Sequence, residues 1–280
     1  MKANVNVPLQ ATMQATTQPT TLAAIQTATR ATTQATTKAT TKSTAKATTK
    51  TVYETLIFQD RVDAGRQLAR KLMRYRDENP IVLALPRGGV VVGYEVAHAL
   101  SAPLDVIVAR KLGVPGHARL SIGAIAPGNA RALDQEALRW LRLSQYQLDR
   151  IVAGETVELN RSVQIYRGDR VAPEIHGRTV ILVDDGLATG MTAYAALLSL
   201  QQQEPHRLVV AVPVGARQTA EAMRTEVDDL VCASIPDHFR AVGLWYRNFE
   251  TVTDAEAICL LERNRGERLP KLNKIRYEPE

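Results

Sequence analysis

The sequence predicts an α/β domain built on a doubly wound, mostly parallel sheet, and two observations support this. Short runs of apolar, β-prone residues, each ended by turn residues, recur between residues 53 and 265. The segments between these runs carry apolar residues at helical spacing. Strands that alternate with helices in this way usually form a parallel sheet with helices on both faces. We therefore expect one domain over residues 53–265.

The domain is expected to begin with a helix that Asp60 caps. Asp60 precedes a segment in which Val62, Leu68, Leu72 and Met73 fall on one apolar face. A short side-chain acceptor just before such a face is a common helix start, because it satisfies free backbone N–H groups. Further along, strands are expected at 81–85, 104–108 and 121–126, helices at 90–100 and 134–165, and a Gly/Pro loop at 112–119.

The second half continues the alternation and ends with a capped helix. Thr253 and Glu256 have the spacing of a capping box ahead of the apolar residues 257–261. The last residues, 266–280, are polar and expected to form a loose tail. Strands are expected at 180–183, 207–212 and 230–235, and helices at 192–202 and 216–226.

Residues 1–52 are expected to form a disordered, basic, low-complexity tail. The segment repeats tetrads such as Ala-Thr-Thr-Lys and has few large apolar residues, so burial cannot offset the entropy lost on ordering. Threonine is also a poor helix former, and lysines four residues apart would repel one another on a helix. The acid-poor, hydroxyl-rich composition leaves two other roles open, an organellar transit peptide and a weak, salt-sensitive contact with polyanions.

The net charge of +6 belongs to this tail. Six of the 35 basic residues lie in 1–50, which has no acid, so the rest of the chain has 29 basic residues against 29 acidic ones. A formally neutral domain argues against a specific nucleic-acid-binding surface. No signal-peptide core and no apolar run of about 18 residues occurs, which predicts that the chain has no membrane span.

The two cysteines, Cys232 and Cys259, each lie between apolar neighbours. Cysteines in such surroundings are usually buried thiols. Two cysteines alone do not make a zinc site, and reduced thiols indicate a reducing compartment. The cytoplasm is therefore the expected location.

The segment from Val180 to Thr192 is the most informative part of the chain. Four apolar residues lead into two adjacent acids, Asp184 and Asp185, and the turn Gly-Leu-Ala-Thr-Gly-Met-Thr then opens a helix. Backbone N–H groups at a helix N-terminus stabilise an anion. Carboxylates at the end of a parallel strand suit sugar hydroxyls or a hydrated divalent cation. Together these features describe a site for a phosphorylated ribose, and the structural alternative is an ordinary turn with solvated acids.

This segment resembles the phosphoribosyl-diphosphate-binding signature of the type I phosphoribosyltransferases, and is most similar to the form of adenine-type members. The resemblance covers roughly residues 55–265. It implies transfer of a phosphoribosyl group from 5-phosphoribosyl 1-diphosphate to a nitrogen acceptor, with magnesium as cofactor and release of diphosphate. It also implies that Asp184 and Asp185 hold the ribose hydroxyls and fix the magnesium shell. The implied 5′-phosphate cradle consists of Ala188, Thr189, Gly190, Met191 and Thr192.

The turn after the first strand is expected to contact the diphosphate. It reads Pro86-Arg87-Gly88-Gly89, in which the glycines let the backbone approach a ligand and Arg87 can grip phosphate oxygens with two donors. Its place in the chain matches the diphosphate loop of the family. A tight turn with a solvated arginine is the alternative interpretation.

Arg110 and Lys111, at the end of the next strand, are expected to act in catalysis with Arg87. Together with the segment 112–119 they resemble the flexible catalytic loop of adenine-type members. Two cations ahead of a Gly/Pro hinge could neutralise the departing diphosphate while the loop excludes water. His117 could donate a proton to the diphosphate, or it could be a plain loop histidine.

The aromatic segment 235–249 resembles the hood that stacks on the nucleobase in oxopurine-type members, with Phe239 and Trp245 as the expected contacts. Core aromatics at the sheet edge are the alternative. The oxopurine pattern has an acid near Tyr246 and another at the position of Ala188. Their absence argues against hypoxanthine or guanine as the acceptor.

Two other functions remain open at this stage. The chain could bind 5-phosphoribosyl 1-diphosphate as a non-catalytic regulator, although it has no helix-turn-helix signature. It could also hydrolyse the same ligand, which would release diphosphate without an acceptor. A homodimer is one expected assembly, and the sequence does not identify the acceptor.

Overall fold

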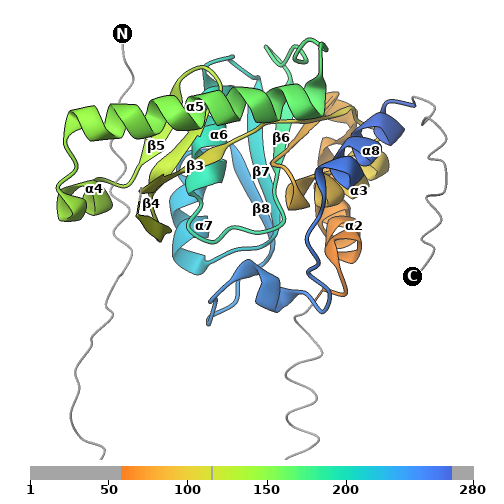
Figure 1. Cartoon of the computed structure of the whole chain (residues 1–280). Helices are drawn as coiled ribbons and strands as arrows, with labels where there is room; N and C mark the ends of the chain where they lie inside the picture. Colours follow the sequence, from red (N-terminus) through yellow and green to blue (C-terminus); the bar gives the residue numbers. More distant parts are fainter. Residues whose placement is uncertain (1–57, 115, 267–280) are drawn as a thin grey trace, which may run out of the picture. The chain divides into compact units, whose positions relative to one another are not determined.

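The structure, a computed structural model, describes residues 58–114 and 116–266 (Figure 1). The tail expected over 1–52 lies outside the described residues, and so does the C-terminal segment 267–280. Within the described part, no helix is both long enough and apolar enough to cross a membrane.

A five-stranded parallel sheet forms the centre, in the order β2-β1-β6-β7-β8. The chain builds outward from β1 to β2, then returns to the other side of β1 with β6, so the order reverses between β1 and β6. In open α/β sheets such a switch point is where ligands bind. The strands are β1 (Ile81–Ala84), β2 (Leu104–Val106), β6 (Thr179–Val183), β7 (Arg207–Val214) and β8 (Asp229–Ser234).

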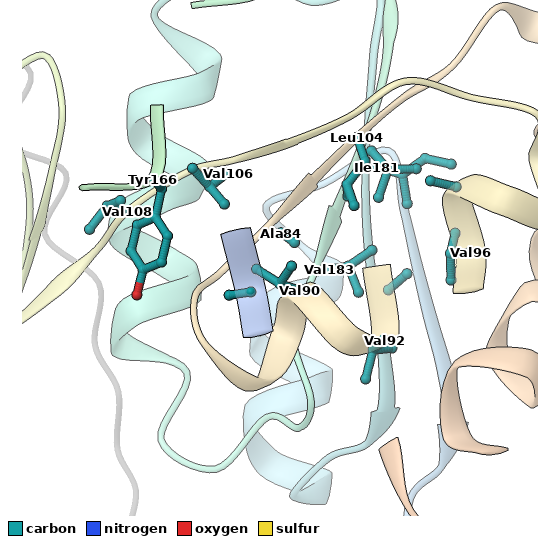
Figure 2. Packing of buried hydrophobic residues seen from close by; sticks show 14 of the residues in the cluster. Ala84, Val90, Val92, Val96, Leu104, Val106, Val108, Tyr166, Ile181 and Val183 are labelled. Carbon is teal, nitrogen blue, oxygen red and sulfur yellow. The ribbon is translucent and has the colours of Figure 1, made fainter. Parts of the chain in front are cut away.

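Helices cover both faces of this sheet, which confirms the doubly wound α/β fold (Figure 1). Alternate strand residues face opposite sides: Val82 and Ala84 join one buried cluster, and Ile81 and Leu83 join the other. Figure 2 shows the first cluster, where Ala84 and Val183 lie near Val90 of α3. The helices are α2 (Arg61–Leu72), α3 (Gly88–Leu100), α6 (Met191–Gln201), α7 (Arg217–Arg224) and α8 (Asp254–Asn264), with 3₁₀ turns η1 (Met73–Glu78) and η2 (Val242–Trp245).

The predicted Gly/Pro loop at 112–119 is wrong, because its flanks are strands. A second, antiparallel sheet has the order β3-β4-β5, with β3 at Arg110–Val114, β4 at His117–Ala126 and β5 at Ala130–Leu133. Leu112 and Val114 are buried while the flanking Lys111 and Gly113 are exposed, which is the alternation of a strand. Strand β5 was not predicted from the sequence.

The single helix predicted over 134–165 is two helices, α4 (Gln135–Leu141) and α5 (Gln145–Arg167). Arg142 adopts a left-handed conformation, with φ of 50°, and ends α4. Ser144 then starts α5 with a capping box to Gln147. The long helix α5 packs against the β3–β4 hairpin (Figure 1).

The predicted helix caps are confirmed. The Asp60 carboxylate accepts a hydrogen bond from the backbone N–H of Asp63 at 2.8 Å, and Thr253 and Glu256 form the capping box of α8. Met73, expected on the buried face of the first helix, is 40% exposed because the helix tightens into η1 at that residue. Both cysteines are free thiols and only partly buried, not full core residues.

Candidate functional site

Two turns meet at the switch point between β1 and β6. A Cβ atom added to Gly88, in the turn after β1, would lie 2.0 Å from Oδ2 of Asp185, which follows β6. One added to Gly89 would lie 3.0 Å from the Cα atom of Asp184. The peptide bond between Pro86 and Arg87 in this turn is cis. The structure thus brings the glycine turn and the acid pair into direct contact, and only glycine fits there.

Asp184 is a partly buried acid beside a second acid. One of its carboxylate oxygens accepts a hydrogen bond from the backbone N–H of Asp185 at 2.8 Å. Burial, and then the charge of Asp185, raise the pKa of Asp184 well above its usual range, and Lys111 acts in the opposite direction. A cation that neutralises the acid pair would therefore be favoured here.

Asp185 is held from two sides. Its Oδ2 atom lies 2.8 Å from Nε of Arg61, and the two side chains are 17% and 10% exposed. Its backbone carbonyl accepts a hydrogen bond from the hydroxyl of Tyr246 at 2.5 Å. Burial, and then Asp185, raise the pKa of that tyrosine. Arg61 was not predicted from the sequence as a site residue, and it lies 124 residues from Asp185 in the chain.

The turn between β6 and α6 rests on the neighbouring strand. Leu187 donates its backbone N–H to Val214 at 2.8 Å, and Ala216 donates to the Leu187 carbonyl at 2.8 Å. The hydroxyl of Thr219 donates to the carbonyl of Ala188 at 2.6 Å. Gly190 has φ of 73°, and a Cβ atom there would lie 2.6 Å from Thr219. The turn is therefore a fixed framework.

The backbone N–H groups of residues 188–192 are separate from the contacts that hold this turn. None of the N–H groups of residues 188–192 donates to an acceptor in the part of the chain that the structure describes. They surround the N-terminus of α6, and both Ala188 and Thr189 are exposed. Met191 and Thr192 are partly exposed on the first turn of the helix. Such a set of unpaired donors suits an anion with several oxygens.

Arg87 extends from the glycine turn toward the N-terminus of α8. Its Nε atom lies 4.0 Å from the carboxylate of Asp254, and both side chains are 47% exposed. The same carboxylate accepts a hydrogen bond from the hydroxyl of Tyr166 on α5. Within residues 58–114 and 116–266, Arg87 therefore has one loose ionic partner, and its exposure leaves it able to reach a ligand.

Arg110 and Lys111 have different surroundings. Nε of Arg110 lies 2.7 Å from Oε2 of Glu155 on α5. Neighbouring strand residues point to opposite faces, so Lys111 points away from α5, and its charge acts on Asp184. Of these two cations, Lys111 is the one whose charge acts on Asp184, and Arg110 is paired with Glu155.

The hood, residues 235–249, lies over the acid pair. A Cβ atom added to Gly186 would lie 2.5 Å from Val242 of the hood. Phe239 and Trp245 are partly buried and pack against a small cluster. The more exposed ring is that of Phe249, at 37%. That cluster contains Phe58, Ala64, Val214 and Tyr246.

Among residues 58–114 and 116–266, no three or more His, Cys, Asp or Glu side chains gather as a metal site. The acid pair is therefore the carboxylate donor set available beside the free N–H groups. Two carboxylates alone would leave most positions around a cation to waters or to a ligand.

The comparisons with known proteins concern the family and the fold of the chain. The family model for the phosphoribosyl transferase domain matches residues 54–246. Two curated Mycobacterium tuberculosis proteins, from strains CDC 1551 / Oshkosh and ATCC 25618 / H37Rv, are provisionally named phosphoribosyl transferases. Each is 41% identical over 207 residues, which is 74% of this chain and 47% of the relative. The chain thus spans about half the length of these relatives.

A solved structure is similar to this chain in fold and in sequence. The crystal structure of TT1426 from Thermus thermophilus is 40% identical, with a TM-score of 0.64, and the match covers 74% of this chain and 99% of that one. Given the family match over residues 54–246, the chain belongs to the phosphoribosyl transferase domain family.

Proposed function

We propose that the chain transfers the phosphoribosyl group of 5-phosphoribosyl 1-diphosphate to a nitrogen acceptor and releases diphosphate. One observation carries the proposal: the acid pair, the glycine turn and the unpaired N–H groups of 188–192 meet at one sheet edge. The ligand has one chemical group for each of these features. Its vicinal hydroxyls suit the acid pair, its diphosphate suits the glycine turn, and its 5′-phosphate suits the N–H groups of 188–192. The family match supports the same activity.

The 5′-phosphate is assigned to the turn of residues 188–192. Its N–H groups have no acceptor among the described residues, and the hydroxyls of Thr189 and Thr192 can add two further donors. Because Val214 and Thr219 hold the turn from below, the donors are in position before the ligand arrives. Preorganised donors of this kind stabilise an anion without reorganisation.

The ribose hydroxyls are assigned to Asp184 and Asp185. Ionised carboxylates only accept hydrogen bonds, and ribose hydroxyls can donate them. The same charges stabilise positive charge that develops on the ribose when its bond to diphosphate breaks. The acid pair thus has a role in binding and a role in the reaction.

The diphosphate is assigned to the glycine turn, Arg87 and Lys111. Gly88 and Gly89 let this turn pack directly against the acid pair, and Arg87 is half-exposed beside them. Lys111 lies on the acid-pair side of β3. Arg110, the third predicted catalytic cation, can join them only after its ion pair with Glu155 opens.

Magnesium fits this donor set. It usually binds one or two carboxylates together with substrate phosphates and keeps several waters. Asp184 and Asp185 would hold it, and a cation would stabilise the ionised form of Asp184, whose pKa is raised by burial and then by the charge of Asp185. When bound, the metal neutralises part of the diphosphate charge.

The transfer needs little covalent chemistry from the protein. The bond from the ribose to diphosphate breaks as the acceptor nitrogen forms its bond to the same carbon, with an oxocarbenium-like ribose between. Arg87 and Lys111 stabilise the charge that builds on the diphosphate, and the fixed turn holds the sugar in line with the acceptor. We place a flat nucleobase at the hood, with Phe239 and Trp245 as its aromatic side.

A diphosphate-release assay with magnesium tests the proposal. We expect release that depends on one class of acceptor among purines, pyrimidines and small amines, and a new nucleotide product of matching mass. Asp184→Asn combined with Asp185→Asn serves as the inactive control. Release at the same rate without any acceptor would show a hydrolase instead, and binding without release would show a regulator.

A further inference from the structure

Three contacts fix the guanidinium group of Arg61. Its Nε atom donates to Oδ2 of Asp185 at 2.8 Å, and its Nη1 atom donates to the carbonyl of Glu250 at 2.7 Å. The guanidinium carbon lies 3.7 Å from the ring centroid of Phe249. The side chain is 10% exposed, so its charge is largely shielded from water. Arginine alone combines a planar fork of donors with stacking on an aromatic ring.

The space for this arrangement comes from the glycine turn. A Cβ atom on Gly88 would lie 2.7 Å from Nε of Arg61 and 2.0 Å from the Asp185 carboxylate. Arg61 itself opens α2, directly after its N-cap residue Asp60. Residues from three distant parts of the chain, α2, the glycine turn and the strand end after β6, therefore meet at Asp185.

The ion pair with Arg61 gives Asp185 a hydrogen-bonded cationic partner that the structure does not give to Asp184 among the described residues. Oδ2 of Asp185 already accepts from Arg61, so its Oδ1 atom has more acceptor capacity left for a ligand. Two unpaired carboxylates would repel a ligand that carries several phosphate charges. Arg61 offsets that repulsion through its ion pair with Asp185, and it does so without contacting the ligand.

Arg61 also connects the acid pair to the acceptor side. Phe249 is the last residue of the hood, where the nucleobase is proposed to lie, and Glu250 follows it directly. A shift of this end of the hood would move the guanidinium group, and with it the Asp185 carboxylate.

We infer that Arg61 is a positioning residue that orients Asp185 toward the ribose hydroxyls and links this acid to the hood. The inference rests on the proposed function, because it names how the same ligand is held. Arg61 acts through Asp185 and does not itself contact the ligand.

A double-mutant cycle on ligand affinity tests this. Titration calorimetry with 5-phosphoribosyl 1-diphosphate and magnesium is run on the wild-type chain, Arg61→Gln, Asp185→Asn and the double variant. A charged hydrogen bond in a shielded site corresponds to roughly a 10- to 100-fold effect, so Arg61→Gln should weaken binding by that factor. In the Asp185→Asn background the same change should weaken binding by less than about threefold, because Asp185 is the route of its effect.

Arg66→Gln is the matched control. Arg66 lies on the same helix, is 65% exposed and pairs with Glu95, so its removal should leave the affinity unchanged. Arg61→Lys keeps the charge without the fork and should recover part of the affinity that Arg61→Gln loses. If Arg61→Gln fails to fold, Arg61→Lys takes its place, and the loss of affinity is again compared between the wild-type and Asp185→Asn backgrounds. Phe249→Leu is compared in the same way; it removes the aromatic contact of Arg61 and leaves the ion pair with Asp185 in place.

The outcomes separate the inference from the proposed function. An equal loss of affinity in both backgrounds, or no loss in either, would overturn the positioning role while the wild-type chain still binds. Absence of binding by the wild-type chain would overturn the proposed function, and the inference with it.

Discussion

The hydroxyl of Tyr246 donates a hydrogen bond to the backbone carbonyl of Asp185 across 61 residues of sequence. Tyr246 is 5% exposed, and its ring lies 4.9 Å from that of Phe249 and 5.5 Å from that of Phe58. The tyrosine thus fastens the hood to the strand end that carries the acid pair. Since Arg61 holds the side chain of the same aspartate, both parts of Asp185 are fixed by residues outside its own turn.

Tyr246→Phe should change how stability depends on pH above 10. Burial, and then the charge of Asp185, raise the pKa of Tyr246 above its ordinary value of 10.0. Above pH 10 the unfolded chain releases this proton while the folded chain keeps it, so the free energy of unfolding falls as pH rises. One such proton contributes about 1.4 kcal/mol per pH unit.

Urea unfolding between about pH 8 and pH 11 measures this slope, on either side of the ordinary tyrosine pKa. The wild-type chain should lose stability more steeply than Tyr246→Phe, although the variant starts lower at the acid end because it lacks the hydrogen bond. Tyr75, Tyr166 and Tyr194 also have raised pKa values, so both chains lose stability in this range and only their difference is assigned to Tyr246. Parallel slopes would mean that the hydroxyl titrates freely in the folded protein.

The two acids of the site should differ in their effect on folding. Asp185→Asn leaves the largely buried Arg61 without its anionic partner, and should cost about 1–3 kcal/mol of unfolding free energy. Asp184→Asn removes a carboxylate whose charge is already disfavoured by burial and by Asp185, and should cost less or even stabilise the protein. Denaturant unfolding at neutral pH in a chelator compares the two variants. Equal losses of unfolding free energy would contradict the view that Arg61 stabilises Asp185 more than Asp184.

The parts of the site that depend on neighbouring residues in the chain can be predicted from the sequence, and the parts that depend on contacts between distant segments cannot. The strand, acid pair, turn and helix of residues 179–201 are set by neighbours in the chain, and the structure has them nearly where the pattern predicts. The pairing of Asp185 with Arg61 joins two elements through tertiary packing. Nothing in the residues next to Arg61 indicates that its partner is an aspartate 124 residues further along the chain.

The errors in the fold have similar causes. Gly113 weakens the alternation of β3, and Gly116 lies between the two strands and gives the segment the composition of a loop. Cross-strand pairing, such as that of Lys111 with Ala124, stabilises the strands where the local pattern is weak. The break between α4 and α5 depends on Arg142 in a left-handed conformation, which glycine or asparagine would usually indicate. The two cations 110 and 111 look equivalent in sequence, and only the packing of α5 separates them.

Lys111→Ala should reduce turnover more than ligand binding. Its charge is needed when diphosphate departs, and removal of one preorganised donor lowers the rate by about 100-fold. Arg110→Ala is the matched control, since Arg110 is paired with Glu155 on the other face of β3, and should have the smaller effect. Steady-state kinetics of diphosphate release gives kcat and KM for both. A normal kcat with only a raised KM for Lys111→Ala would contradict its role in the transition state.

Gly88→Ala should separate the acid pair from its arginine. The new methyl group would lie 2.0 Å from the Asp185 carboxylate and 2.7 Å from Nε of Arg61, so at least one of them must move. Overpacking of this kind costs about 1–3 kcal/mol, and affinity for 5-phosphoribosyl 1-diphosphate should fall with it. Gly154→Ala, on the exposed face of α5 with nothing within 4 Å, is the control and should stabilise the chain by about 0.5–1 kcal/mol. Thermal unfolding and calorimetry on the two variants decide the matter: if Gly88→Ala binds as tightly as the wild-type chain, the close contact between the glycine turn and Asp185 is not required for the ligand.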